Sequence, residues 1–270
     1  MSVASKPSPM TLMSNPQPSG AFAWTQEPAG RVLRCRPLLD IADHFFTTRD
    51  LRLRDDEEEW VRVARTIVVA PDALRLVHQV HGRGVLVARG AAPAGRHWPD
   101  ADVIVSDDPS VAIVVRVADC APVLIGDRRL GVVAAAHAGW RGTVQRAAPA
   151  AVTALTETFG SRPADLMAAI GPSLGPCCGE VGDEVVEAFR DAGHDAAALA
   201  RWFAPGASGR PHVDLWRANR DQLEAAGVPS DAIHVAALCT KTHARVLHSY
   251  RADRERAGRM AGVIRVKGRR

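Results

Sequence analysis

Two apolar runs near the middle of the chain constrain its fold more than any other feature. Residues 111–117 and 131–136 consist almost entirely of valine, isoleucine and alanine, and a shorter apolar run at 123–125 lies between them. Short, continuous apolar runs rich in β-branched residues are typical of strands that are buried on both faces. The sequence therefore predicts a buried sheet through the centre of the protein.

Patterns typical of helices and of further strands alternate around this sheet. Apolar spacing and end signals predict helices at 60–64, 143–159 (closed by Gly160) and 182–192 (ended by Gly193), and a helix that is capped by Asp214, includes 215–220 and stops at 227–229. Further strands are predicted at 32–39, 74–80, 85–87, 233–238 and 261–266. Because strands and helices intermix without the strict βαβ order of a Rossmann fold, we predict an α/β (α+β) fold of mixed β-sheets flanked by helices.

Length and composition favour one compact domain. A chain of 270 residues with 47% hydrophobic residues can bury a substantial core. The first thirty residues are rich in Pro and Ser, and they lack the basic start and the uninterrupted apolar run of a signal peptide. We therefore expect a disordered N-terminal tail over 1–30 and a single folded domain over 31–270.

The charge pattern and the cysteines exclude several classes of partner and location. The net charge of +4 comes from 34 basic and 30 acidic residues without a long block of like charge, so we expect no nucleic acid partner. No stretch approaches eighteen consecutive apolar residues, so we expect no membrane span. Five cysteines, an odd number in a chain too long to need disulfides, indicate a reducing cytoplasm.

Three segments place a histidine or a cysteine directly after an apolar run: His81, Cys120 and His137. Strand ends are held rigidly, so side chains at neighbouring ends can converge. Two imidazoles and one thiolate suit zinc and leave a fourth position for water or substrate. Two of these residues also have a plainer interpretation, because Cys120 suits a small buried core position and His137 suits a hydrogen-bonded turn. His78 would face the opposite side of a regular strand, so we do not count it as a ligand.

Arg141 follows the His137 loop immediately before a predicted helix. The unpaired amides of a helix start and the guanidinium group would together hold an anion. A phosphate or a carboxylate is therefore the ligand expected at this position.

The motifs resemble those of the YfiH family, also called the laccase-domain or peptidoglycan editing factor family. With 45–49 they cover most of the chain in the family's order, and ADC followed by HAGWRG is the most specific part. The segments are HQVHG (78–82), DADVIVS (100–106), ADCAPVLIGD (118–127), AAAHAGWRG (134–142), IGPSLGPCCGEVGDEV (170–185), DLWRANRDQL (214–223) and CTKTHARVLHSYRADRERAGR (239–259).

The resemblance implies a YfiH-like catalytic domain over 31–270, of the type shared with cytotoxic necrotizing factor and cysteine hydrolases. It implies that His81, Cys120 and His137 are the catalytic residues and bind zinc, with copper as a substitute. It also implies phosphorolysis of adenosine, inosine, guanosine or methylthioadenosine to the base and ribose 1-phosphate, together with adenosine deamination. The implied partners are a purine nucleoside and phosphate, and the implied state is a monomer or a homodimer.

Several positions near these motifs have two interpretations. Arg49, in the family's Thr-Arg motif, suits a phosphate or ribose contact and equally a surface salt bridge. The family's loop after Arg49 is shortened here to 50–54, and Gly179 replaces an aromatic residue. Tyr250 suits a structural role with a buried ring. The adjacent Cys177 and Cys178 suit two packed thiols, because neighbouring cysteines seldom close a disulfide without strain.

Other function classes remain open. A copper polyphenol oxidase (laccase) needs paired His-x-His groups, and the sequence contains none. A thiol hydrolase would use Cys120 as nucleophile and His137 as base, and it would suit the editing of peptidoglycan precursors. A binding module without catalysis would turn over no nucleoside.

Overall fold

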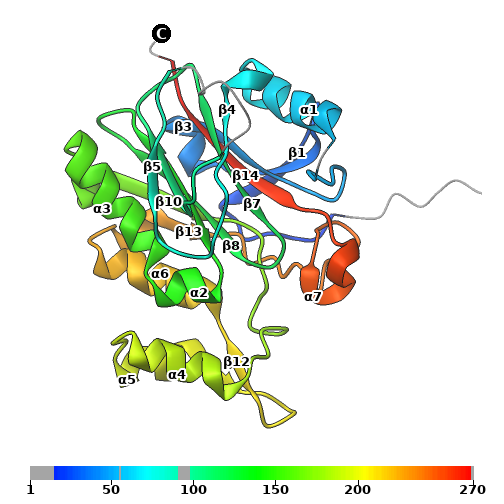
Figure 1. The fold of residues 1–270 in the computed structure, drawn as a ribbon, viewed down its shortest axis with the longest axis vertical. Coiled ribbons are helices and arrows are strands. Elements are labelled where there is room, and N and C mark those ends of the chain that lie inside the picture. The colour runs from blue at the N-terminus through cyan, green and yellow to red at the C-terminus, as the bar shows by residue number, and fades with distance from the viewer. Residues whose placement is uncertain (1–14, 55, 91–97, 269–270) are drawn as a thin grey trace, which may run out of the picture.

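Two six-stranded sheets form the centre of the protein. The computed structural model describes residues 15–54, 56–90 and 98–268 (Figure 1). The first sheet has the order β1-β2-β3-β14-β7-β4 and the second the order β13-β10-β8-β9-β6-β5. Most neighbouring strands are antiparallel, whereas β4 with β7, β5 with β6 and β10 with β13 are parallel. The prediction of an α/β fold with mixed sheets is confirmed.

The strands are short and are spread along the whole chain. Those of the first sheet are β1 (Phe22–Glu27), β2 (Gly30–Cys35), β3 (Ala42–Thr47), β14 (Met260–Val266), β7 (Ala112–Val117) and β4 (Leu74–Arg75). Those of the second are β13 (Ile233–Val235), β10 (Leu166–Ile170), β8 (Ala121–Asp127), β9 (Val133–Ala138), β6 (Val103–Ser106) and β5 (Val85–Val87). A small hairpin joins β11 (Phe203–Pro205) to β12 (Pro211–Val213).

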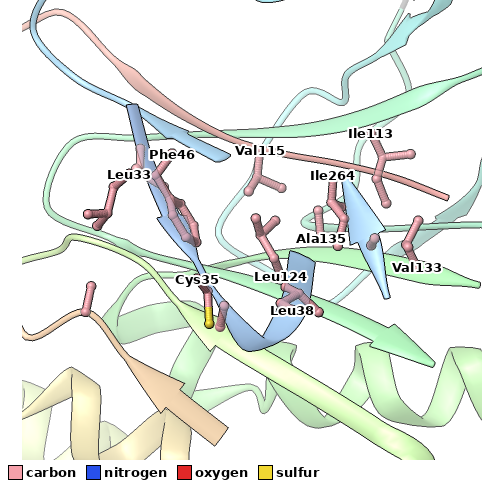
Figure 2. Packing of buried hydrophobic residues seen from close by; sticks show 14 of the residues in the cluster. Leu33, Cys35, Leu38, Phe46, Ile113, Val115, Leu124, Val133, Ala135 and Ile264 are labelled. Atoms are coloured by element: carbon pink, nitrogen blue, oxygen red, sulfur yellow. The ribbon is translucent and has the colours of Figure 1, made fainter. Parts of the chain in front are cut away.

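The two sheets pack face to face over a shared apolar core. Figure 2 shows this layer, in which Leu33 and Phe46 of the first sheet meet Leu124 of the second. The alternate residues Val32 and Phe45 point to the opposite face of the first sheet. This two-residue alternation explains how β-branched strands fill two apolar layers at once.

Helices cover the outer face of each sheet. Helix α1 (Glu57–Ile67) packs on the first sheet through Ile67 and its neighbours, and α3 (Ala147–Phe159) and α6 (Leu215–Ala225) pack on the second. The result is an α/β/β/α arrangement, with helices α4 (Asp183–Asp191) and α5 (Ala196–Trp202) extending beyond it beside β12 (Figure 1). Two short helices, α2 (Trp140–Val144) and α7 (Tyr250–Asp253), and five 3₁₀ turns complete the described elements, the turns being Pro37–Asp40, Pro71–Ala73, Pro163–Asp165, Ser230–Ala232 and Arg254–Arg256.

Helix 143–159, expected as one element, is two in the structure. Arg146 adopts a left-handed backbone (φ 62°) that separates α2 from α3, and its guanidinium donates to the carbonyls of Ala192 and Gly193. Gly160 ends α3 with φ 73°, as expected. The strand expected at 74–80 is only β4, because the chain leaves the sheet there.

The disordered tail predicted over 1–30 extends too far, because its last part is folded. β1 lies within this segment and pairs with β2 from Phe22↔Cys35 to Glu27↔Gly30. Phe22 is buried in the core, and this burial outweighs the Pro- and Ser-rich composition that precedes it. Residues 1–14 lie outside the described residues. No helix in the described ranges has the length and apolarity needed to cross a membrane.

Candidate active site

The structure brings His81, Cys120 and His137 together at one edge of the second sheet. Their ring nitrogens and sulfur lie within 4.8 Å of one another. The two imidazole rings are 4.8 Å apart between centroids, with planes inclined by 70°. Cys120 directly precedes β8 and His137 lies on the adjacent β9, where Pro122 pairs with His137, whereas His81 lies in the loop before β5. The pairing of β8 with β9 therefore sets the distance between the thiol and one imidazole.

A buried carboxylate positions both histidines. The Asp102 side chain is fully buried, and it accepts hydrogen bonds from the backbone N–H groups of His81 (3.0 Å) and Gly82 (2.6 Å). Its Oδ1 also lies 2.8 Å from Nδ1 of His137. Because an ionised carboxylate only accepts, Nδ1 carries a proton, and Nε2 is the nitrogen that can bind a metal or exchange a proton. Sequence reasoning missed Asp102, whose only signal was its place directly before the strand in DADVIVS.

A second carboxylate holds the loop on the other side of Cys120. Asp119 accepts hydrogen bonds from Thr240 Oγ1 (2.6 Å), from Ser249 Oγ (2.7 Å) and from the backbone N–H of Arg251 (2.6 Å). Asp119 has a left-handed backbone (φ 83°), as does His81 (φ 62°), and such a conformation costs a non-glycine residue about 1–2 kcal/mol. The hydrogen bonds to the two carboxylates offset this strain.

The three side chains shift one another's protonation. Burial raises the pKa of the Cys120 thiol, but the charge of His137 and hydrogen bonds from both histidines outweigh it and bring that pKa to about 6. Burial likewise opposes the charged form of His137, yet the thiolate of Cys120 and the carboxylate of Asp102 raise the pKa of His137 to about 9. The metal-free pair is therefore a thiolate beside an imidazolium at neutral pH.

Gly139 is required by the closeness of the backbone to the thiol. A Cβ at this position would lie 2.4 Å from Sγ of Cys120 and 3.7 Å from the ring of His81. Any other residue would push the thiol out of the cluster. The glycine in HAGWRG thus has a direct steric reason.

A cavity of about 720 Å³ opens beside the cluster. Its wall combines the three side chains with five arginines and a group of apolar residues. The lining residues are Arg54, His78, Gln79, His81, Arg116, Ala118, Asp119, Cys120, His137, Gly139, Trp140, Arg141, Leu174, Val181, Val213, Leu215, Tyr250, Arg251 and Arg259. Asp119 is the one carboxylate among them, and its oxygens are occupied by the loop that it holds.

Backbone carbonyls hold several of these arginines in place. Arg251 donates to the carbonyls of Cys178 (3.2 Å) and Glu180 (2.9 Å), and Arg54 and Arg259 donate to carbonyls of 255–258. In the described part of the chain no carboxylate forms an ion pair with Arg54, Arg251 or Arg259. Their positive charge is therefore left to attract an anion into the cavity.

The two arginines predicted to bind substrate or phosphate, Arg141 and Arg49, lie in different surroundings. Arg141 lines the cavity as the second residue of the five-residue helix α2 and not at a position before the longer helix α3; an anion site here stays a prediction. The Arg141 guanidinium lies 4.1 Å from the ring centroid of Trp140. Arg49 does not line the cavity, because its guanidinium binds Asp253 (2.8 Å) and the carbonyl of Ala244.

Two further residues occupy the cavity wall. His78 is exposed and bonds to Asp100 (2.7 Å), and it lies outside the three-residue group, as expected. Tyr250 is 40% exposed, so the expectation of a buried ring is wrong. Its hydroxyl donates to Glu255 (2.7 Å), and as the first residue of α7 it projects from the surface of the domain instead of entering the core.

Comparison with known proteins places the chain in a family. The family described as "Multi-copper polyphenol oxidoreductase laccase" matches residues 47–267. The chain belongs to this family. The resemblance drawn from the motifs is therefore confirmed, and the match includes the three-residue cluster, the whole second sheet and strands β4, β7 and β14 of the first sheet.

Similar proteins are named for different activities. A purine nucleoside phosphorylase of Deinococcus radiodurans is 39% identical over 241 residues, 82% of this chain and 88% of the relative. A protein named adenosine deaminase RL5, from an unknown prokaryotic organism, is 41% identical over 140 residues, 52% of each chain. The crystal structure of the hypothetical protein YfiH of Bacillus licheniformis matches with a TM-score of 0.80 at 26% identity, covering 90% of this chain and 97% of that one.

Proposed function

We propose that the protein is a zinc-dependent purine nucleoside phosphorylase that acts in the cavity beside His81, Cys120 and His137. The single observation that carries the proposal is the convergence of two imidazoles and one thiol on an arginine-lined cavity. Relatives named for this activity support it. The cysteines, all five of which are free, suit the reducing cytoplasm in which such an enzyme would work.

The donor set fits zinc. His81, Cys120 and His137 offer two nitrogens and one sulfur, which are ligand types that zinc prefers, in the number typical of a catalytic zinc site. The hydrogen bond from His137 to Asp102 is the carboxylate–histidine contact that orients such ligands. Zinc held there, or copper as its substitute, would supply a Lewis acid with an open position toward the cavity.

The arginines suit the phosphate. A guanidinium group matches the oxygens of phosphate in a two-pronged contact, and Arg251 and Arg259 are pre-set by carbonyl hydrogen bonds. Arg141 lies beside them on the wall, 4.1 Å from the ring of Trp140. These side chains would hold phosphate beside the ribose and balance the negative charge that it brings.

The remaining wall suits a purine nucleoside. The cavity of about 720 Å³ falls within the usual size of small-molecule sites. Apolar side chains such as Leu174 and Val213 offer a dry surface for the base, and Trp140 offers an aromatic face. The site would thus exclude water from the sugar–base bond while the arginines hold phosphate.

The decisive test is base release from adenosine, inosine, guanosine and methylthioadenosine, with and without phosphate, alongside elemental analysis. We expect His81→Ala, Cys120→Ala and His137→Ala each to lower phosphate-dependent base release at least 100-fold, because each removes one ligand. The control is Arg162→Ala, an exposed arginine paired with Asp165 away from the cavity, with unchanged activity. Full activity in any of the three ligand variants would reject the proposed site.

The phosphate site has its own prediction. Arg141→Ala should raise the KM for phosphate about tenfold, the loss of one charged contact of about 1.4 kcal/mol, with little change in the KM for nucleoside. Initial rates over a phosphate series measure this, with Arg162→Ala again as the matched control. Equal KM values for phosphate in both variants would remove Arg141 from the anion site.

A thiol hydrolase is the second candidate, because the order Cys120, His137, Asp102 is that of a nucleophile, a base and its orienting group. The thiolate–imidazolium pair of the metal-free site favours it as well. A cell-wall precursor amide would then be the substrate. Chelation should leave such an enzyme active and thiol alkylation should inactivate it, whereas a zinc enzyme loses activity with chelator and regains it with zinc.

Two further activities are tested in the same assay. Adenosine deamination, for which one relative is named, needs only an activated water at the same site and would appear as inosine formed without phosphate. Polyphenol oxidation has weaker support. Among the described residues the only histidine-containing group of three ligands holds two histidines, too few for a four-copper centre.

A further inference from the structure

A second cluster of ligands lies next to the proposed active site, because the cavities beside the two clusters share Trp140, Arg141 and Arg251. The sulfur atoms of Cys177, Cys178 and Cys239 lie within 4.8 Å of one another. Two turns supply them: Cys177 and Cys178 follow β10, and Cys239 follows β13. Cys239 is buried, whereas Cys177 is exposed, so the cluster is anchored in the fold and open to solvent on one side.

We propose that Cys177, Cys178 and Cys239 form a second metal site that binds zinc(II), with the hydroxyl of Thr242 at its fourth corner. A zinc–sulfur bond of about 2.3 Å places two sulfurs of a tetrahedral site about 3.8 Å apart. The sulfurs of Cys177 and Cys178 are 3.7 Å apart. The separation of this pair therefore matches that of two zinc ligands.

The hydroxyl completes the same tetrahedron. A zinc–oxygen bond of about 2.1 Å beside the sulfur bonds gives oxygen–sulfur edges of about 3.6 Å. Oγ1 of Thr242 lies 3.4 Å from the sulfur of Cys177 and 3.6 Å from that of Cys178. Three soft sulfurs select zinc or copper(I) over magnesium or calcium, and the fourth, oxygen corner favours four-coordinate zinc.

The charge of the surroundings suits an occupied site. Three thiolates and one zinc ion carry a net charge of −1. Cys177 and Cys178 line a second cavity of about 610 Å³. Its wall holds more basic than acidic residues: Arg141, Arg210, Lys241, Arg251 and Arg254 against Glu180 and Glu184. These cations would stabilise the negative complex, and the cavity gives the ion a path from solvent.

The backbone brings the two turns together before any ion binds. The backbone N–H of Ser173 donates to the carbonyl of Leu238 (3.2 Å), and the backbone N–H of Thr240 donates to the carbonyl of Ser173 (3.0 Å). Gly175 lies between the two turns without a side chain, where a Cβ would lie 2.6 Å from the ring of Trp216 and 3.1 Å from Cβ of Cys239. Zinc would thus link two turns that are already in contact, so its binding would require little movement of the backbone.

The experiment counts zinc in the full chain, purified under reducing conditions, stripped of metal and titrated against a chromophoric chelator. We expect two zinc ions in the wild type and one in Cys239→Ser, while Cys35→Ser, a core cysteine outside both groups, keeps two. In the Cys120→Ala/His137→Ala background we expect one ion, whose binding releases thiol protons. Cobalt(II) in that background should show thiolate-to-metal charge-transfer absorption.

Cys177→Ser is a second variant that separates loss of a ligand from misfolding, because Cys177 is exposed and its replacement leaves the core intact. In the Cys120→Ala/His137→Ala background it should weaken zinc binding at least tenfold while the circular dichroism spectrum stays unchanged. Unchanged stoichiometry in Cys239→Ser, no zinc bound in the Cys120→Ala/His137→Ala background, or a disulfide within the cluster despite reducing conditions would overturn the proposal. None of these outcomes depends on nucleoside turnover, so the proposed function is tested separately.

Discussion

At the scale of single residues, the candidate site depends on two carboxylates, Asp102 and Asp119. Their oxygens accept hydrogen bonds from the groups that hold the three-residue cluster in place. Asp102 joins the His81 loop to the ring of His137, and Asp119 joins the turn at Cys120 to the loop that begins α7. Each carboxylate makes hydrogen bonds to groups far away in sequence, so neither role is visible in the local pattern. The ligand residues occur in motifs, but their supports are set by contacts between distant segments.

Asp102→Asn tests this support directly. The amide replaces one accepting oxygen by an N–H₂ group that would face the N–H donors now bound, so His137 loses its orientation. We expect zinc affinity to fall 10- to 100-fold, as for other groups that orient metal-bound histidines. Competition with a chelator measures it, and Asp100→Asn, which removes an exposed partner of His78, should leave the affinity unchanged. Equal affinities in the two variants would show that Asp102 does not position a ligand.

At the scale of elements, local sequence signals and tertiary contacts have separate roles. Helix caps are local: Asp56, Asp195 and Asp214 each accept a hydrogen bond from a backbone N–H two or three residues ahead, as their sequence positions favour. The break between α2 and α3 is not local, because Arg146 is held left-handed by carbonyls at the end of α4. Of the three capped helices, α1 and α6 were predicted and α5 was not, so a local cap alone did not reveal a short helix, and the contact that divides α2 from α3 left no local signal.

The cap of α5 gives an element-scale prediction. The Asp195 carboxylate accepts from the N–H of Ala198 at 2.7 Å, and α5 does not line the proposed active site. Asp195→Ala should therefore lower the free energy of unfolding by about 1 kcal/mol and the Tm by about 2–4 °C, with kcat/KM unchanged. Urea denaturation measures the loss. Asp195→Asn keeps an accepting oxygen and is the control; a loss as large as that of the Ala variant would argue against a cap role.

At the scale of the whole molecule, stability depends on a core that holds polar groups in fixed protonation states. His44 lies on β3 and is fully buried; its Nε2 accepts from the N–H of Cys35 (3.0 Å), and its Nδ1 lies 3.2 Å from the carbonyl of Ala42. Burial lowers the pKa of His44 to about 4, with Arg34 adding to this. Protonation would place a second donor against Cys35, so the folded state keeps this ring neutral.

His44 therefore makes stability depend on pH with a definite sign. The folded pKa of about 4 lies below the unfolded value of about 6.5, so the unfolded chain binds more protons between them and stability falls as pH falls. From pH 8 to pH 5 this one group should cost about 2 kcal/mol of unfolding free energy. Denaturation at both pH values measures the loss of unfolding free energy in the wild type and in His44→Gln. The difference between the two losses is the contribution of His44, because the other titrating groups are shared. Equal losses would contradict the neutral buried histidine.

The sequence by itself determined the class of fold, most of the strands and helices, and which three side chains to examine as ligands. Apolar alternation and cap residues act over a few neighbours, so the chain displays them without folding. Only the tertiary structure decided that β1 joins the first sheet, that Arg49 binds Asp253 instead of lining the cavity, and that Asp102 orients His137. These outcomes depend on burial and on hydrogen bonds between residues far apart in the chain, which no local pattern encodes.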